Sequence, residues 1–161
     1  MSPRLRAPVL AVALLLAVPA GSGTAEEHGQ QHAPVAVPAQ AAIARTPRPA
    51  DAVLYVIAPA DGATVKSPVT IQFGLRGMGV APAGVDSPNT GHHHLVVDAP
   101  TPPLDLPLPA DAQHLHFGGG QTETTLELPP GTHTLQLVLA DKVHIPHDPP
   151  LVSERITFTV K

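Results

Sequence analysis

Hydrophobic and polar residues alternate along several short stretches of the chain after residue 50. In the segment 69–75 the alternate positions are all apolar: Val69, Ile71, Phe73 and Leu75. In the segment 131–141 the corresponding positions are His133, Leu135, Leu137 and Leu139. A period of two is typical of a β-strand that buries one face. These stretches are therefore predicted to be strands that pack on a common core.

Turn-forming residues separate the strand patterns. The β-rich stretch 52–59 is followed by the turn sequence ADGA, and the stretch 122–128 by Pro129-Pro130-Gly131. With 21 prolines and 13 glycines in 161 residues, long helices are excluded. About seven strands over residues 51–161 predict an all-β fold, an immunoglobulin-like antiparallel β-sandwich.

The first 25 residues have the order of a secretory signal peptide. Arg4 and Arg6 precede an apolar run over residues 9–18, and small residues follow. That run is too short for a membrane span, which needs roughly 20 residues. Cleavage is expected after Ala20 or Ala25, which would leave a mature protein without a membrane span. We therefore expect a periplasmic or secreted protein.

Residues 26–50 differ in composition from the rest of the chain. They are rich in Ala, Pro and Gln and show neither the strand period nor the helix period. A segment without an apolar face cannot join a core, so this one is predicted to be a disordered spacer. The chain is thus divided into a signal peptide (1–25), a spacer (26–50) and one β-sandwich domain (51–161).

Composition and charge exclude some partners. Cysteine is absent, so neither a disulfide nor a thiolate metal ligand is available. Loss of the leader lowers the formal charge from −4 by two to −6, because Arg4 and Arg6 leave with it. One Tyr, three Phe and no Trp offer few rings for stacking on bases. An acidic protein without a basic surface is not expected to bind nucleic acid.

Three consecutive histidines, His92, His93 and His94, open the strand pattern GHHHLVVD. Because side chains alternate on a strand, His93 is expected to face the core together with Leu95 and Val97. His92 and His94 would then project outward from the sheet. The two residues are about two strand rises apart, so both imidazoles could reach one metal ion.

Two further histidine pairs follow. One is His114 and His116 in HLHF, where the same alternation turns Leu115 and Phe117 inward, and the other lies in HIPH. Imidazole nitrogens suit zinc and copper ions. The sequence therefore predicts a site for a divalent transition metal, copper or zinc, with these candidate ligands: His92, His94, His114, His116, His144 and His147.

Other roles would also account for the histidines. They could form a structural hydrogen-bond network, as expected of His93 and His133, or transfer protons in catalysis. A metal-dependent enzyme would also need an open coordination position and a base such as Glu123 or Asp98. A cell-envelope module would instead bind an envelope protein or a glycan.

Catalysis has less support in the sequence than binding. No serine of the mature chain lies in a G-x-S-x-G turn, which argues against a serine hydrolase. No readable carboxylate pair supports glycosidase chemistry. A binding domain is therefore favoured over an enzyme.

Two shorter stretches carry weaker hypotheses. Cleavage after Ala25 would expose Glu26-Glu27-His28, whose amine, backbone amides and imidazole can form a square-planar nitrogen set for Cu²⁺ or Ni²⁺. Gly118-Gly119-Gly120 could bind an anion through its amides, but without a following helix pattern a turn is the favoured interpretation.

Several of these motifs together resemble a bacterial exported family, the domain of unknown function 4399. The motifs are GHHH from residue 91, HFG from 116, QTE from 121, PGTHTL from 130 and HIPH from 144. The likeness covers roughly residues 53–160, with one departure at Gly119, where members similar to HFGKGQTE have a basic residue. The resemblance implies an exported protein with an immunoglobulin-like outline. It implies no activity, because none is assigned to the family.

Overall fold

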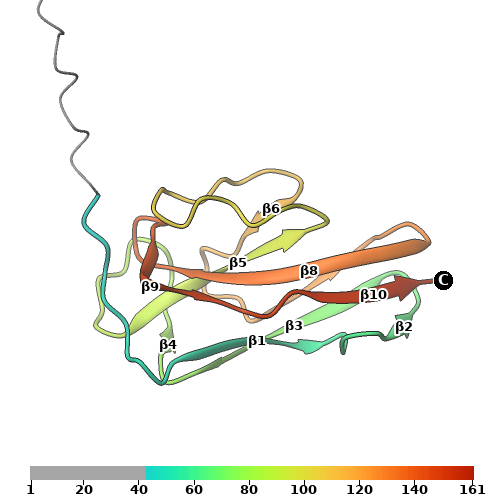
Figure 1. The fold of residues 1–161 in the computed structure, drawn as a ribbon, viewed down its shortest axis with the longest axis horizontal. Helices are drawn as coiled ribbons and strands as arrows, with labels where there is room; N and C mark the ends of the chain where they lie inside the picture. The colour runs from blue at the N-terminus through green and yellow to red at the C-terminus, as the bar shows by residue number, and fades with distance from the viewer. Residues whose placement is uncertain (1–42) are drawn as a thin grey trace, which may run out of the picture. The chain divides into compact units, whose positions relative to one another are not determined.

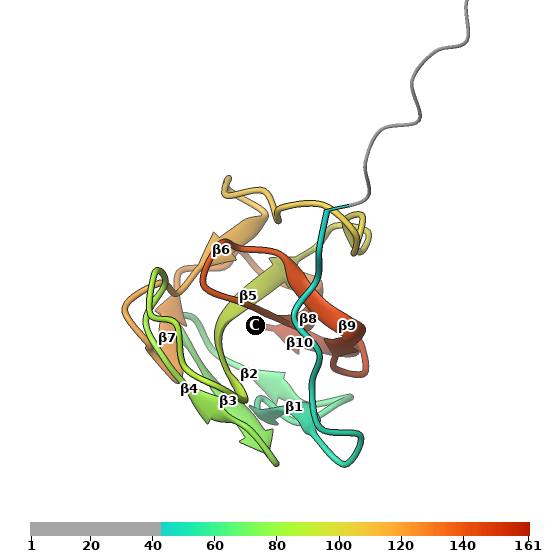
Figure 2. The ribbon, with the colours of Figure 1, turned by 90° about the vertical axis from the view of Figure 1, so that its left-hand side faces the viewer.

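The computed structural model describes residues 43–161, which form ten β-strands and no helix. Figure 1 shows the fold, in which three of the strands make a small sheet in the order β1–β3–β7, all three labelled in Figure 2. Its strands are β1 (Val53–Ala58), β3 (Val69–Arg76) and β7 (Glu123–Leu126). β1 and β3 pair antiparallel.

The other seven strands form the larger sheet. Its main path runs β2–β10–β8–β5–β4, while β6 pairs with β5 and β9 pairs with β8. The bounds are β2 (Thr64–Val65), β4 (Gly79–Val80), β5 (Thr90–Val97), β6 (His114–His116), β8 (Gly131–Ala140), β9 (Pro146–Val152) and β10 (Ile156–Val160).

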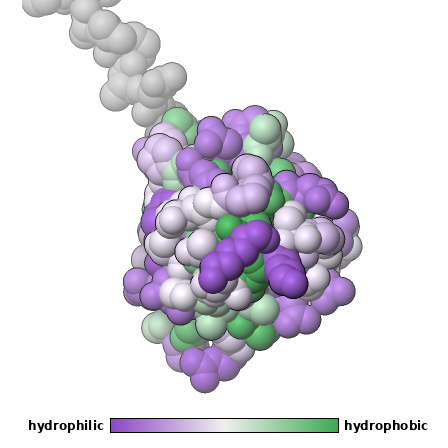
Figure 3. Space-filling view, turned by 90° about the vertical axis from the view of Figure 1, so that its right-hand side faces the viewer, coloured by the Kyte–Doolittle hydropathy of each residue, from purple (hydrophilic) through white to green (hydrophobic). Residues whose placement is uncertain are grey.

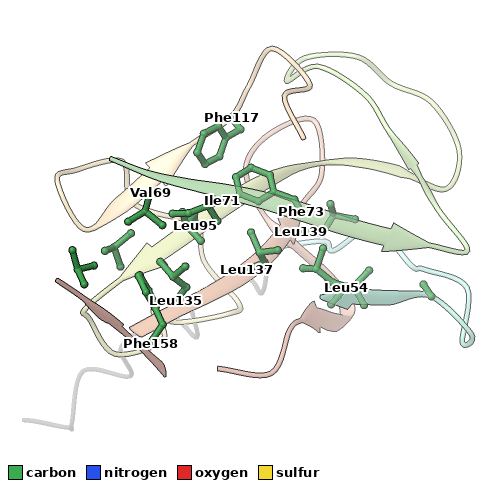
Figure 4. Close-up of a cluster of buried hydrophobic side chains, with 14 residues drawn as sticks. Leu54, Val69, Ile71, Phe73, Leu95, Phe117, Leu135, Leu137, Leu139 and Phe158 are labelled. Atoms are coloured by element: carbon green, nitrogen blue, oxygen red, sulfur yellow. The ribbon is translucent and has the colours of Figure 1, made fainter. Parts of the chain in front are cut away.

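The main core lies between the two sheets, and Figure 4 shows its side chains. The small sheet contributes Val69, Ile71 and Phe73, and β8 contributes Leu135 and Leu137 together with Leu139. These are the alternate apolar positions of the two sequence patterns. The prediction of an all-β sandwich is therefore confirmed.

The strand count and pairing differ in detail from the expectation. Ten strands are present in residues 43–161, where about seven were expected. The three additional strands are β2 and β4, pieces of two residues that are too short to show a period of two, and β9, in which Pro146, Pro149 and Pro150 interrupt the strand pattern. β2 pairs parallel with β10, and β4 pairs parallel with β5, so the arrangement is not purely antiparallel. The immunoglobulin-like type stays a prediction.

A second, smaller apolar cluster lies on the other face of the larger sheet. It joins Val96 of β5 and Val138 of β8 to Leu108 in the proline-rich segment 99–110. That segment therefore covers part of the sheet face that points away from the main core.

Residues 45–48, in the segment predicted to be a spacer, lie along β9 (Figure 2). The guanidinium of Arg45 donates to the carbonyls of Pro146 and His147, and Arg48 donates to the carbonyl of Pro149. The contacts of the fold therefore begin upstream of Asp51. The predicted signal peptide and Glu26-Glu27-His28 lie outside the described residues.

At the end of the sandwich where the C-terminus lies, hydrophilic and intermediate residues surround small apolar areas (Figure 3). Within residues 43–161, no helix has the length and apolar character needed to cross a membrane.

Candidate metal centre

The pairing of β5 with β6 brings three of the predicted ligands together. His92 and His94 are alternate residues of β5, so both side chains leave the same face of the sheet. His116 of β6 lies directly opposite His94 in the antiparallel pair. Directly opposed residues have Cβ atoms about 4.5–5.5 Å apart. The register therefore gathers three imidazoles on the face that points away from the main core.

The three imidazoles are close enough to share an ion. Nε2 of His92 and Nε2 of His94 are 3.1 Å apart. The ring centroid of His116 is 5.0 Å from the centroid of each of the other two. One ring nitrogen from each residue lies within 4.8 Å of the others. Two imidazole nitrogens on one tetrahedral zinc ion would be about 3.3 Å apart, so small ring rotations would complete the geometry.

His144 approaches this cluster from a loop. Its ring centroid is 4.7 Å from that of His116, 5.0 Å from that of His92 and 6.0 Å from that of His94. The cluster of His92, His94, His116 and His144, here called the imidazole cluster, thus combines two strands and one loop.

Asp141 fixes the turn that carries His144. The amide of His144 donates to the backbone carbonyl of Asp141 at 3.0 Å. Oδ1 of Asp141 accepts from the amides of Val143 and Ile145. Its Oδ2 accepts from the hydroxyl of Thr46 at 2.8 Å. The backbone of His144 is thereby held at the edge of the sheet.

His92 and His94 are buried, which corrects the expectation that they project outward. Their exposed fractions are 0% and 2%. Alternation is right about the face that they share, but it does not reveal what covers that face. The segment 99–110 and the turn at 141–145 lie there, joined by a bond of 2.9 Å from the amide of Leu108 to the carbonyl of His144. Of the three strand histidines in the cluster, only His116 is exposed.

Burial determines the charge of these imidazoles. Desolvation, reinforced by His144 and His116, lowers the pKa of His92 to about 4. Desolvation and the neighbouring imidazoles lower the pKa of His94 to about 3. The pKa of His116 is lowered as well, by burial and by His144. The buried pair is therefore neutral at pH 7, which is the protonation state that binds a metal.

Two ring nitrogens of the cluster have no hydrogen-bond partner. Within the described chain, Nδ1 of His92 and Nδ1 of His94 are buried and unpaired. Nε2 of His93 and Nδ1 of His147, outside the cluster, are likewise buried and unpaired among the described residues, so this feature is not particular to the cluster.

Gly118 makes room for the ring of His116. A Cβ atom added at Gly118 would lie 2.3 Å from Cε1 and 2.5 Å from Nε2 of that imidazole. Gly118-Gly119-Gly120 is predicted to form a turn, and the amide of Gly120 does donate to the carbonyl of Phe117 at 3.1 Å. Nothing in the sequence separates a glycine that packs on a ring from a turn glycine, so this role was missed.

Two predicted ligands lie outside the cluster. His114 is opposite Val96, two residue pairs along the ladder from the opposed pair His94 and His116, and its Nδ1 is 2.9 Å from Oδ1 of Asp111. His147 is buried, and its Nε2 lies 3.2 Å from the carbonyl oxygen of Thr90. The structure therefore brings together four of the six candidates.

His93 and His133 make the backbone contacts expected of structural histidines. His93 lies in the core beside Phe73, with ring centroids 5.2 Å apart, and its Nδ1 is 3.3 Å from the carbonyl oxygen of Gln121. Nε2 of His133 donates to the carbonyl of Pro129 at 2.9 Å.

The two carboxylates named as candidate bases are engaged elsewhere. Asp98 accepts from Nδ1 of His133 and from the amide of Thr134. Glu123 lies on the small sheet and accepts from the side-chain amide of Gln72. The carboxylate that acts electrostatically on the cluster is Asp141, which favours the protonated form of His92.

The described residues thus define an all-β sandwich with an imidazole cluster under one face of its larger sheet. The chain belongs to the family described as a domain of unknown function (DUF4399), whose model matches residues 71–161. The match contains every residue of the imidazole cluster and confirms the family resemblance. Comparison with curated proteins and with solved structures gave no match.

Proposed function

We propose that this chain is an exported bacterial domain that binds one divalent transition-metal ion, copper or zinc, for storage, delivery or protection. The observation that carries the proposal is the convergence of His92, His94 and His116, whose ring nitrogens lie within 4.8 Å of one another. Export is supported by the signal-peptide pattern of residues 1–25.

The convergence of neutral ring nitrogens supports an ion over a purely structural network. The Nε2 atoms of His92 and His94 face each other 3.1 Å apart, and one ring nitrogen from each of His92, His94 and His116 lies within 4.8 Å of the others. Neutral imidazoles crowded at this distance offer several lone pairs to a single cation.

The donor set narrows the choice of ion. Only imidazoles converge, without a thiolate and without a carboxylate ligand among the described residues. Imidazole sets suit zinc and copper, whereas magnesium and calcium prefer oxygen ligands. Three ligands from strands and a fourth from a loop fit a tetrahedral or tetragonal ion.

The test is elemental mass spectrometry on tag-free mature protein recovered from the bacterial periplasm. We expect near-stoichiometric copper or zinc in the wild type and its loss in the double variant His92→Ala/His94→Ala. His114→Ala is the matched control, because it removes an imidazole from β6 outside the cluster. If folded wild-type protein holds no metal even after reconstitution, the histidines are structural, and an envelope protein or a glycan becomes the partner to seek.

A further inference from the structure

We propose that His144 is an exchangeable fourth ligand and that the ion enters and leaves beside it. This inference rests on the proposed metal site and adds the route by which the ion is exchanged. The strand ligands hold the ion in place, and the loop ligand exchanges.

The strand ligands form a fixed base. His92 and His94 belong to an eight-residue strand that is paired with β8 on one side and β6 on the other. Both side chains are fully or almost fully buried. Moving either imidazole away from an ion would require a change in the sheet or its cover.

His144 has a fixed backbone and a free ring. Its amide donates to Asp141, its carbonyl accepts from Leu108, and its φ of 69° is held by these bonds. Among residues 43–161, by contrast, the His144 ring has no hydrogen-bond partner. Side-chain rotation is fast compared with loop opening, so the ring can leave an ion while the turn stays in place.

Solvent reaches the cluster from the side of His116 and His144. His116 is exposed and His144 is half-buried, and their rings are the closest pair in the cluster, with centroids 4.7 Å apart. His92 and His94 lie beneath them. An incoming nitrogen donor or small anion would therefore form its bond to the ion as the bond from His144 breaks, with no change in oxidation state.

The variant His144→Gly tests this inference. Glycine adopts a φ of 69° without strain, and the missing ring leaves space for added imidazole. Co²⁺ is the spectroscopic probe, because its visible absorption reports coordination number, and Zn²⁺ with a competing chelator gives the affinity and the release rate.

We expect folded His144→Gly to retain Co²⁺, to bind it at least about tenfold more weakly and to release Zn²⁺ faster. Added imidazole or azide should change its spectrum, with imidazole restoring the wild-type form, at concentrations that leave wild type and His114→Ala unchanged. Circular dichroism would verify that each variant is folded.

Three outcomes would overturn the inference. A His144→Gly protein with the wild-type spectrum and affinity would show that His144 is not a ligand. A folded variant that binds no metal would show that His144 is a permanent ligand. Wild-type protein that binds none of Co²⁺, Zn²⁺ and Cu²⁺ would overturn the metal site and, with it, the exchange route.

Discussion

Histidines of this chain differ in charge because their neighbours differ. Nδ1 of His133 is 2.7 Å from Oδ2 of Asp98, and its Nε2 is 2.9 Å from the carbonyl oxygen of Pro129. Since a carboxylate and a carbonyl only accept, both contacts are satisfied together only when both ring nitrogens carry hydrogens, so they favour the imidazolium form of His133. The hydrogen bond to Asp98 raises its pKa. In the imidazole cluster, burial lowers the pKa of His92 and His94 instead.

The ion pair of His133 and Asp98 predicts a pH dependence of stability. Because the folded pKa of His133 is raised above its ordinary value of 6.5, the pair stabilises the fold fully below about pH 6.5. This contribution is lost as the pH rises through the folded pKa. The difference in unfolding free energy between wild type and Asp98→Asn should therefore be larger at about pH 6 than at about pH 9.

Urea unfolding at the two pH values measures that difference. Asparagine tolerates the positive φ of Asp98, so backbone strain does not separate the two proteins. The substitution also weakens the hydrogen bond to the amide of Thr134, but this lowers the unfolding free energy equally at both pH values. An equal difference at the lower and the higher pH would show that His133 is not charged in the fold.

Gly118→Ala is predicted to damage the metal site without removing a ligand. Its methyl group would collide with the ring of His116 and push it out of the cluster. Metal affinity should fall by about tenfold or more, as for changes that disturb ligand orientation. Gly119→Ala is the control, because its nearest contact, at 3.0 Å, is the flexible end of Gln121. Competitive zinc titration measures the zinc affinity of both variants. Equal zinc affinities of Gly118→Ala and Gly119→Ala would contradict the proposed collision with His116.

At the scale of elements, β5 and β8 connect the core to the site. Leu95 and Leu137 are directly opposed in this pair and face the main core, while Val96 and Val138 face the covered side. Gly91 permits the close approach at the start of β5, since a Cβ there would lie 2.6 Å from the carbonyl oxygen of Ala140. Around these residue pairs, the sheet is thus apolar on both faces.

Leu137→Ala should be strongly destabilising, because its side chain has 0% exposure. We expect a loss of about 2–5 kcal/mol of unfolding free energy, from lost burial and the cavity left behind. The exposed Thr157→Ala on β10 should cost less than about 1 kcal/mol. Urea unfolding of metal-free protein measures both losses. Similar small losses would mean that the core tolerates a void between the sheets.

At the scale of the whole molecule, the proposed ion should stabilise the fold. An ion that binds only the folded chain, at free concentrations about 100 times its Kd, contributes about 2.7 kcal/mol. For a domain of this size, Tm should rise by roughly 10 °C. The rise should vanish with a chelator and in His92→Ala/His94→Ala. If that double substitution instead lowers Tm equally with and without metal, the structural role is favoured.

The alternation of residues along single strands predicted much of the fold and half of the site. Alternation placed Ile71, Phe73 and Leu137 in the core, and it placed His92 and His94 on one face, because a period of two is a property of each strand alone. The same reasoning failed for His114, which has the strand spacing of a ligand but lies two residue pairs too far along the ladder.

The sequence by itself determined that the domain is an all-β sandwich, that His93 faces its core and which histidines had the spacing of ligands. Only the tertiary structure decided that His92 and His94 meet His116 and His144, that a proline-rich segment buries them, and that His147 lies apart. Alternation is set by neighbours along the chain, whereas register, loop cover and solvent exposure depend on segments distant in sequence. For this reason, the chemistry of the cluster was decided by the packing of the whole domain.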